Sequence, residues 1–213
     1  MSINRREFLR GGIKGTAAYT LLASTMLGSH NAMATDSDPE TSELSEDEIK
    51  HLEYMREEEK LARDVYLTMY ETWGLPVFSR IAESEQLHTD AVKAKLEKYG
   101  LVDPVVDDTA GVFVDTDLAV LYDTLILQGE VSELDALYVG GAIEEIDMID
   151  IQEAIDHSDS KDVIRVYENL MKGSESHLRA FVSQIEEMGV EYQAQYLPQE
   201  EVDAIVNYTG SVS

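Results

Sequence analysis

Residues 85–88 read Glu-Gln-Leu-His, and they interrupt the apolar face of an otherwise regular helical pattern that runs over residues 77–99. Side chains three positions apart lie on the same face of an α-helix, so Glu85 and His88 are expected to project inward together. A carboxylate on a buried face is costly unless it is paired or coordinates a metal. Gly100 stands where a glycine commonly ends a helix. The stretch therefore predicts a helix whose buried face carries polar chemistry.

Three further segments repeat this helical period with a polar interruption near mid-length. They cover residues 45–73, 132–156 and 161–189, and their interrupting residues are Glu59, Glu144, and Ser174 with His177. The first begins with a capping box, Ser-x-x-Glu at residues 45–48. Within each predicted pair of helices, the polar residues lie at about equal distances from the intervening turn. Antiparallel neighbours meet at equal distances from their turn, so each pair places its polar residues at one level.

The order of these segments predicts an all-α fold. No segment shows sustained alternation of apolar and polar residues, so no sheet is expected. Two tight turns and one long connection predict a four-helix bundle over residues 45–190, made of two antiparallel hairpins joined by a crossover that carries a short helix. Residues 35–44 are polar and acidic and are expected to form a flexible linker. The tail, residues 191–213, is expected to carry one more short helix that begins near Pro198.

Composition and charge exclude several classes of protein. The chain has 213 residues, 43 acidic and 16 basic side chains, a formal net charge of −27 and no cysteine. Without cysteine there are no disulfides, thiolate nucleophiles or iron–sulfur clusters. So acidic a chain is not expected to bind nucleic acid, because it cannot neutralise a run of phosphates. An anionic membrane surface would repel it for the same reason. Metal cations remain suitable partners.

The first 34 residues have the three parts of an export signal. A charged start at residues 4–10 is followed by a modest apolar run and by a small-x-small ending at residues 32–34. Arg5 and Arg6, followed by x-Phe-Leu-Arg, resemble the twin-arginine signal, which implies export of an already folded protein to the periplasm or the extracellular space. An alternative is a membrane anchor, but the apolar run is shorter than the ~20 residues that a span needs. After cleavage behind Ala34, no membrane association is expected.

The polar interruptions together match a known metal-binding pattern. In di-iron carboxylate bundles, two helices each contribute a Glu, and the other two each contribute a Glu-x-x-His pair. On this pattern the candidate metal ligands are Glu59, Glu85, His88, Glu144 and His177. The alternative is that His88 and His177 are core histidines hydrogen-bonded to nearby carboxylates. The cost of burying several unpaired carboxylates favours the metal.

Four stretches carry a specific family resemblance. Residues 58–66 resemble the first helix of rubrerythrin-type proteins, residues 84–88 resemble the second, residues 144–147 the third and residues 174–177 the fourth. The region 45–190 is similar to a bacterial and archaeal domain-of-unknown-function family of the ferritin-like superfamily. The resemblance implies a ferritin-like fold and a site for two metal ions, iron first, with manganese or another divalent metal as alternatives. It adds Asp147 as a ligand from the third helix.

The chain departs from the family pattern at the fourth helix. Ser174 stands where a Glu is expected, so Asp147 would compensate, or the site would be asymmetric or hold one ion. The expected scheme has Glu59 and Glu144 bridging, Glu85 and Asp147 binding terminally, and one histidine on each ion. If the helix phases are shifted by one residue, the ligands would be Glu58 and Glu145. With no cysteine there is no rubredoxin-like iron centre, so electrons would come from an unidentified donor.

Two tyrosines are candidates for a catalytic role. Tyr66 follows Glu59 by seven residues, and Tyr167 precedes Ser174 by seven, so both are expected two helical turns from the site. A tyrosine there could relay an electron or donate a hydrogen bond to a ligand carboxylate. The alternative is a core-edge residue with a satisfied hydroxyl.

The sequence predicts an exported di-metal protein that oxidises Fe(II) with oxygen or peroxide. One alternative uses the same residues for metal binding, storage or sensing without turnover. Another is a metal-free interaction bundle whose polar core sets helix register. His51 and His157 are expected at the surface. The sequence leaves open the physiological metal, the number of ions, the oxidant, the reductant and whether the chain forms a homo-oligomer.

Overall fold

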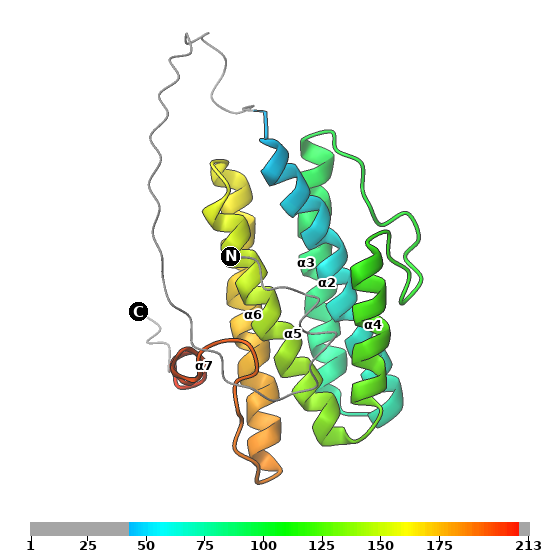
Figure 1. The fold of residues 1–213 in the computed structure, drawn as a ribbon, viewed down its shortest axis with the longest axis vertical. Coiled ribbons are helices and arrows are strands. Elements are labelled where there is room, and N and C mark those ends of the chain that lie inside the picture. The colour runs from blue at the N-terminus through cyan, green and yellow to red at the C-terminus, as the bar shows by residue number, and fades with distance from the viewer. Residues whose placement is uncertain (1–42, 209–213) are drawn as a thin grey trace.

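The computed structural model describes residues 43–208, and helices account for most of this range (Figure 1). Their bounds are α2 Glu46–Trp73, α3 Pro76–Lys98, α4 Thr116–Gly129, α5 Glu133–Asp156, α6 Lys161–Glu187 and α7 Gln199–Val206. No strand occurs in the described residues, so the expectation of an all-α fold is confirmed. No helix within residues 43–208 is both long enough and apolar enough to cross a membrane. The predicted export signal and most of the predicted linker lie outside the described residues.

Local sequence explains where the helices begin and end. The hydroxyl of Ser45 accepts from the backbone N–H of Glu48, whose carboxylate accepts from the backbone N–H of Ser45, which closes the predicted capping box. Gly74 ends α2 in the left-handed conformation, with φ of 69°. Pro76 follows in the first turn of α3, where its missing N–H costs nothing. These residues produce the first tight turn.

The helices pack as two hairpins with the crossover laid against one side. α2 packs along α3, and α5 packs along α6. The two pairs meet through contacts between α2 and α5 and between α3 and α6. The crossover helix α4 packs on α2 and α5, and the short α7 packs on α6 (Figure 1). The described residues thus contain two packed pairs of long helices, with one shorter helix in the connection between the pairs.

The interior consists of two apolar clusters on either side of a polar layer. One cluster contains Leu61 and Met69 of α2, together with Phe78 and Phe181. The other lies toward the start of α2 and contains Leu52, Met55, Val92, Leu96, Ile151 and Tyr167. In α2, α3 and α6 the residues between these two groups are the predicted polar interruptions. The polar layer therefore has apolar packing on both sides.

The fourth long helix ends before the predicted residue 189. Met188 is 48% exposed, whereas Ile185 is fully buried. The reason is that α6 ends at Glu187, so Met188 is its C-cap and no longer follows the helical period.

The crossover buries the outer face of α2, which the sequence pattern did not predict. Every residue from Met55 to Tyr66 is buried, including Lys60, which is 0% exposed. The Lys60 ammonium donates to Asp64 at 2.6 Å and to the carbonyl of Thr109 at 3.0 Å, and it lies 4.4 Å from the centre of the Phe113 ring. A buried charge is tolerated when it is paired in this way.

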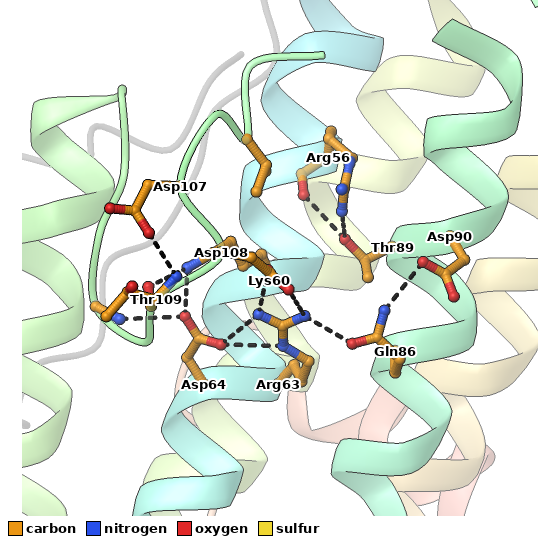
Figure 2. Close-up of polar contacts among 12 residues, drawn as sticks. Arg56, Lys60, Arg63, Asp64, Gln86, Thr89, Asp90, Asp107, Asp108 and Thr109 are labelled. Atoms are coloured by element: carbon orange, nitrogen blue, oxygen red, sulfur yellow. Dashed lines mark hydrogen bonds and ion pairs between the residues drawn. The ribbon is translucent and has the colours of Figure 1, made fainter. Parts of the chain in front are cut away.

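Further contacts of α2 complete this attachment, and Figure 2 shows those of Arg63. Arg63 donates to Asp64, to Gln86 of α3 at 2.6 Å and to Asp108 of the crossover at 2.7 Å. Arg56 holds Asp103 through two bonds of 3.1 Å. The carboxylate of Glu57 accepts the backbone N–H groups of residues 114 and 115, directly before α4. The charged side of α2 thus binds residues 103–115 and determines where α4 begins.

Candidate metal centre

The polar layer brings all six predicted metal ligands together, and all four long helices contribute. Glu59 comes from α2, Glu85 and His88 from α3, Glu144 and Asp147 from α5, and His177 from α6. The four carboxylate residues are only 1–5% exposed. Side chains of this polarity would be expected at the surface, so their convergence in the interior marks a site rather than a packing accident.

Glu85 lies between the two histidines. Its Oε2 is 2.7 Å from Nδ1 of His88, and its Oε1 is 2.7 Å from Nδ1 of His177. The two imidazole ring centres are 5.4 Å apart. Each oxygen of this carboxylate thus faces the Nδ1 atom of a different histidine. This is the geometry in which a carboxylate can bridge two ions.

The remaining glutamates divide between the two histidines. Glu59 Oε2 is 3.2 Å from Nδ1 of His88, and Glu144 Oε2 is 3.5 Å from Nδ1 of His177. Two groups of potential ligands result, Glu59–Glu85–His88 and Glu85–Glu144–His177, and within each group the ligand atoms lie within 4.8 Å of one another. Glu85 is common to both groups.

Asp147 takes part in this cluster with help from Ser174. The Ser174 hydroxyl donates to Asp147 Oδ2 at 2.5 Å, and it also lies 3.0 Å from the carbonyl oxygen of Leu170. Burial and the nearby Glu59 and Glu144 carboxylates raise the pKa of Asp147 well above its usual value. The serine that replaces the expected glutamate is therefore a hydrogen-bond donor to a carboxylate that arrives from α5.

The histidine rings are oriented by two small residues. Nε2 of His177 lies 2.9 Å from the Ser84 hydroxyl, which leaves Nδ1 facing the carboxylates. The His88 ring rests against Gly173 of α6, where an added Cβ would lie 2.4 Å from Cε1 and from Nε2 of that ring. Ligating histidines commonly have their second nitrogen fixed in this way. Ser84 and Gly173 were missed by the sequence analysis, because their roles depend on contacts between different helices.

The two candidate tyrosines occupy different surroundings. The Tyr66 hydroxyl donates to Glu144 Oε1 at 2.5 Å, and its ring packs against Phe78 and Phe181. Tyr167 belongs to the apolar cluster near the start of α2, and its buried hydroxyl has no hydrogen-bond partner among residues 43–208. Tyr66 therefore contacts a candidate ligand directly, closer than the two turns expected.

Burial and mutual contacts shift the pKa values of the cluster in different directions. Burial raises the pKa of Glu59 to about 8 and also raises that of Glu144. Burial opposes ionisation of Glu85 as well, but the close contacts with the two histidines and their positive charges lower its pKa to about 2. The carboxylates in turn outweigh the effect of burial on the imidazoles and raise the pKa of His88 to about 11 and that of His177 to about 10.

Several buried ligand atoms have no hydrogen-bond partner within residues 43–208. They are Oε1 of Glu59, Oδ1 of Asp147 and Nδ1 of His177. The 2.7 Å contact of His177 with Glu85 is close but does not have the direction of a hydrogen bond. Unsatisfied buried polar atoms are rare in folded proteins, and these three lie in one cluster. Oxygen and nitrogen donors of this kind suit iron, manganese or zinc.

The two alternative ligands considered for a shifted helix phase have other contacts. Glu145 accepts hydrogen bonds from the Tyr192 hydroxyl at 2.7 Å and from the backbone N–H groups of residues 195–197. It therefore anchors the segment that leads to α7. Glu58 is bonded to the Tyr54 hydroxyl at 3.1 Å. The helix phases used in the sequence analysis are therefore the ones that the structure has.

Comparison with known proteins places the chain in a family. Residues 48–209 match the family described as "Uncharacterized protein domain (DUF2202)", and the chain belongs to that family. Among its relatives is "Uncharacterized protein MJ0754" of Methanocaldococcus jannaschii, which is 51% identical over 164 residues, or 77% of this chain and 89% of that protein. The crystal structure of hypothetical protein MJ0754 from Methanococcus jannaschii DSM 2661 is similar with a TM-score of 0.78 at 49% identity, and the match covers 82% of this chain and 99% of that one.

Proposed function

We propose that the protein is a ferritin-like di-metal carboxylate protein that binds two divalent ions, iron first, and oxidises Fe(II) with oxygen or peroxide. The observation that carries the proposal is the set of four carboxylates, 1–5% exposed, gathered around two histidines in a layer with apolar packing on both sides. The four long helices, two hairpins and one crossover agree with a ferritin-like bundle, and the twin-arginine-type start agrees with export.

Charge balance favours two ions rather than one. Four ionised carboxylates carry a charge of −4, which two divalent cations neutralise. In their absence the same charge has to be balanced by protonated histidines and by protons on carboxylates of raised pKa. Metal ions would replace these protons, so binding is expected to release protons and to tighten as the pH rises.

The distances suggest a division of roles that differs from the one expected from the sequence. Glu85 would bridge, because it faces both histidines. Glu59 with His88 would hold one ion, and Glu144 with His177 would hold the other. The charges of Glu59 and Glu144 both raise the pKa of Asp147, so Asp147 lies near both carboxylates. It would be the second candidate for a bridging ligand.

The other residues hold these ligands in place. The Tyr66 hydroxyl holds Glu144, and the Ser174 hydroxyl holds Asp147. Ser84 orients the His177 ring through Nε2, and Gly173 leaves room for the ring of His88. Bound iron supplies the capacity for one-electron oxidation and reduction. With peroxide as oxidant, the net reaction would convert two Fe(II) to two Fe(III), while peroxide would take up two electrons and two protons and give two water molecules.

The metal assignment is tested with two neighbouring buried glutamates of α5. Glu144→Gln removes a carboxylate of the cluster, whereas Glu145→Gln makes the same chemical change at a residue that binds the tail. The wild-type chain and Glu145→Gln are expected to bind the same number of Fe(II) ions, at least two per chain, in anaerobic equilibrium dialysis. Glu144→Gln, and likewise Glu85→Gln, is expected to bind at least one ion fewer. Equal stoichiometry in all four proteins would contradict the assignment.

Turnover is tested separately from binding. Wild-type protein loaded with Fe(II) is mixed with peroxide or oxygenated buffer, and the absorbance of Fe(III) is followed over time. Oxidation faster than that of the same iron with Glu85→Gln supports an oxidase. Two bound ions without accelerated oxidation would instead favour metal storage or sensing.

A further inference from the structure

A second group of potential ligands lies away from the central cluster, where the start of α2 meets the end of α5. It contains His51 of α2, Glu153 of α5 and His157, the residue that caps α5. The ligand atoms of these three residues lie within 4.8 Å of one another. The two imidazole ring centres are 5.6 Å apart. The two histidines, which were expected at the surface, thus lie close together at the ends of two helices.

His157 is held in a tautomer that can bind a metal ion through Nε2. Its Nδ1 lies 2.8 Å from the backbone carbonyl oxygen of Glu153. A carbonyl oxygen only accepts hydrogen bonds, so Nδ1 carries the proton and Nε2 keeps its lone pair in the neutral ring. A hydrogen bond from the second ring nitrogen to a backbone carbonyl is a common feature of metal-ligating histidines.

His51 supplies an independent observation. Its Nδ1 is buried and has no hydrogen-bond partner among residues 43–208. Unsatisfied buried nitrogen atoms are rare, because they lose their hydrogen bonds to water without replacing them. Outside the central cluster, His51 is the residue of the described range that combines such an atom with membership of a group of potential metal ligands.

The backbone around this group is fixed by Glu48. Its Oε1 accepts from the Ser158 hydroxyl at 2.7 Å and from the backbone N–H groups of Asp159 and Ser160 at 3.0 and 2.9 Å. Residues three apart share a helix face, so the face of α2 that holds this turn also carries His51. The residue before the turn is His157. The two histidines are therefore set opposite each other by contacts that do not depend on a metal.

We propose that His51, Glu153 and His157 form a binding site for one zinc ion, or a similar divalent transition metal, that is separate from the central cluster and clamps the start of α2 to the end of α5. Two imidazoles and one carboxylate are a ligand set that zinc uses, with water in the fourth position. Magnesium and calcium prefer oxygen ligands, so the two imidazoles favour a transition metal.

The geometry needs only a small adjustment of the side chains. Ligands about 2.0–2.1 Å from a tetrahedral zinc ion are about 3.3 Å from one another. The longest separation in the group therefore has to shrink by no more than about 1.5 Å. Glu153 and His51 are half-buried and His157 is exposed, so rotation of their side chains can provide this closure without moving a helix.

The test compares three single variants of the full chain, prepared without a histidine tag. His157→Gln and Glu153→Gln each remove one proposed ligand. Asp156→Asn is the matched control, because it makes the same charge change as Glu153→Gln at an exposed neighbour in the same turn. The number of bound Zn²⁺ ions is measured by equilibrium dialysis, and Co²⁺ absorption reports tetrahedral coordination.

We expect the affinity of this site for Zn²⁺ to fall more than about tenfold in His157→Gln and in Glu153→Gln. At the lowest Zn²⁺ concentration that saturates the wild type, each of these variants should bind one ion fewer. Asp156→Asn is expected to keep the full number. Unchanged stoichiometry in His157→Gln would overturn the proposal. An equal loss in Asp156→Asn would also overturn it, because the ion would then be held by the general acidic surface. The central cluster is intact in all three variants, so this result is independent of the proposed function.

Discussion

At the scale of single residues, the two tyrosines provide a matched pair. Tyr66→Phe removes only the hydroxyl that donates to Glu144, and the ring contacts with Phe78 and Phe181 remain. We expect metal affinity to fall about 10- to 100-fold, because Glu144 loses the bond that orients it. Fe(II) titration measures this change. Tyr167→Phe is the control, since its hydroxyl has no partner in the described residues, and unaltered affinity is expected. Equal losses would contradict an orienting role for Tyr66.

Gly173 makes a second prediction at this scale. In an exposed helix, replacing Gly by Ala adds up to about 1 kcal/mol of stability. Here the added Cβ would lie 2.4 Å from two atoms of the His88 ring, so the ring has to move. We expect Gly173→Ala to remain folded by circular dichroism but to bind Fe(II) at least about tenfold more weakly. Lys172→Ala, at the exposed neighbouring position, is expected to bind normally. Normal binding by Gly173→Ala would show that the ring position is unimportant.

At the scale of helices and loops, the charged side of α2 determines where the crossover lies. Asp64 accepts from Lys60, from Arg63 and from the backbone N–H of Gly111. Asp64→Ala leaves two buried cations without their main partner, so we expect a loss of about 3–5 kcal/mol in the free energy of unfolding. Asp108 is also bonded to Arg63, but the side chain of Asp108 is 66% exposed, and Asp108→Ala removes this exposed partner. There the expected loss is below about 1 kcal/mol. Urea denaturation measures both, and equal losses would contradict the argument.

Glu48 joins the start of α2 to the turn between α5 and α6, and it predicts a pH dependence. Burial opposes its ionisation, but hydrogen bonds from Ser45, Ser158 and Ser160 outweigh burial and lower its pKa from 4.5 to about 2. A carboxylate with a lowered folded-state pKa stabilises the protein above pH 4.5 and loses this effect as the pH falls toward 2.

Glu48→Gln is therefore expected to lower the free energy of unfolding by about 1–2 kcal/mol at pH 7, because a helix cap and charge-assisted hydrogen bonds are lost. The difference from the wild type should shrink between pH 4.5 and pH 2. Urea midpoints at pH 7, 4.5 and 3 measure it. A difference that is constant over this range would show that the charge of Glu48 is not what stabilises the turn.

At the scale of the whole molecule, metal and stability are expected to be coupled. The chain has a net charge of −27 and gathers four carboxylates in its central cluster, so bound cations are expected to stabilise the folded state. Each occupied site should add about 2.7 kcal/mol to the free energy of unfolding at a metal concentration 100 times its Kd. Thermal unfolding with Mn²⁺, and again after chelation, measures the effect. Glu85→Gln should respond much less. Equal responses of the two proteins would place the bound ions elsewhere.

The sequence alone was sufficient for the helices and for much of the central cluster. Helix positions follow from local signals such as the Ser45 capping box and Gly74, which act within a few residues. The 3.6-residue period then fixes which side chains share a face, and so Glu59, Glu85, His88 and His177 were predicted to point inward. These inferences need only one helix at a time.

The tertiary structure decided how these side chains meet. The position of Glu85 between two histidines, the bond from Ser174 to Asp147 and the contact of Gly173 with His88 each join different helices. The burial of Lys60 beneath the crossover and the pairing of His51 with His157 also join residues far apart in sequence. Periodicity determines the direction of a side chain but not its partner, because the partner depends on how two helices are rotated and shifted against each other.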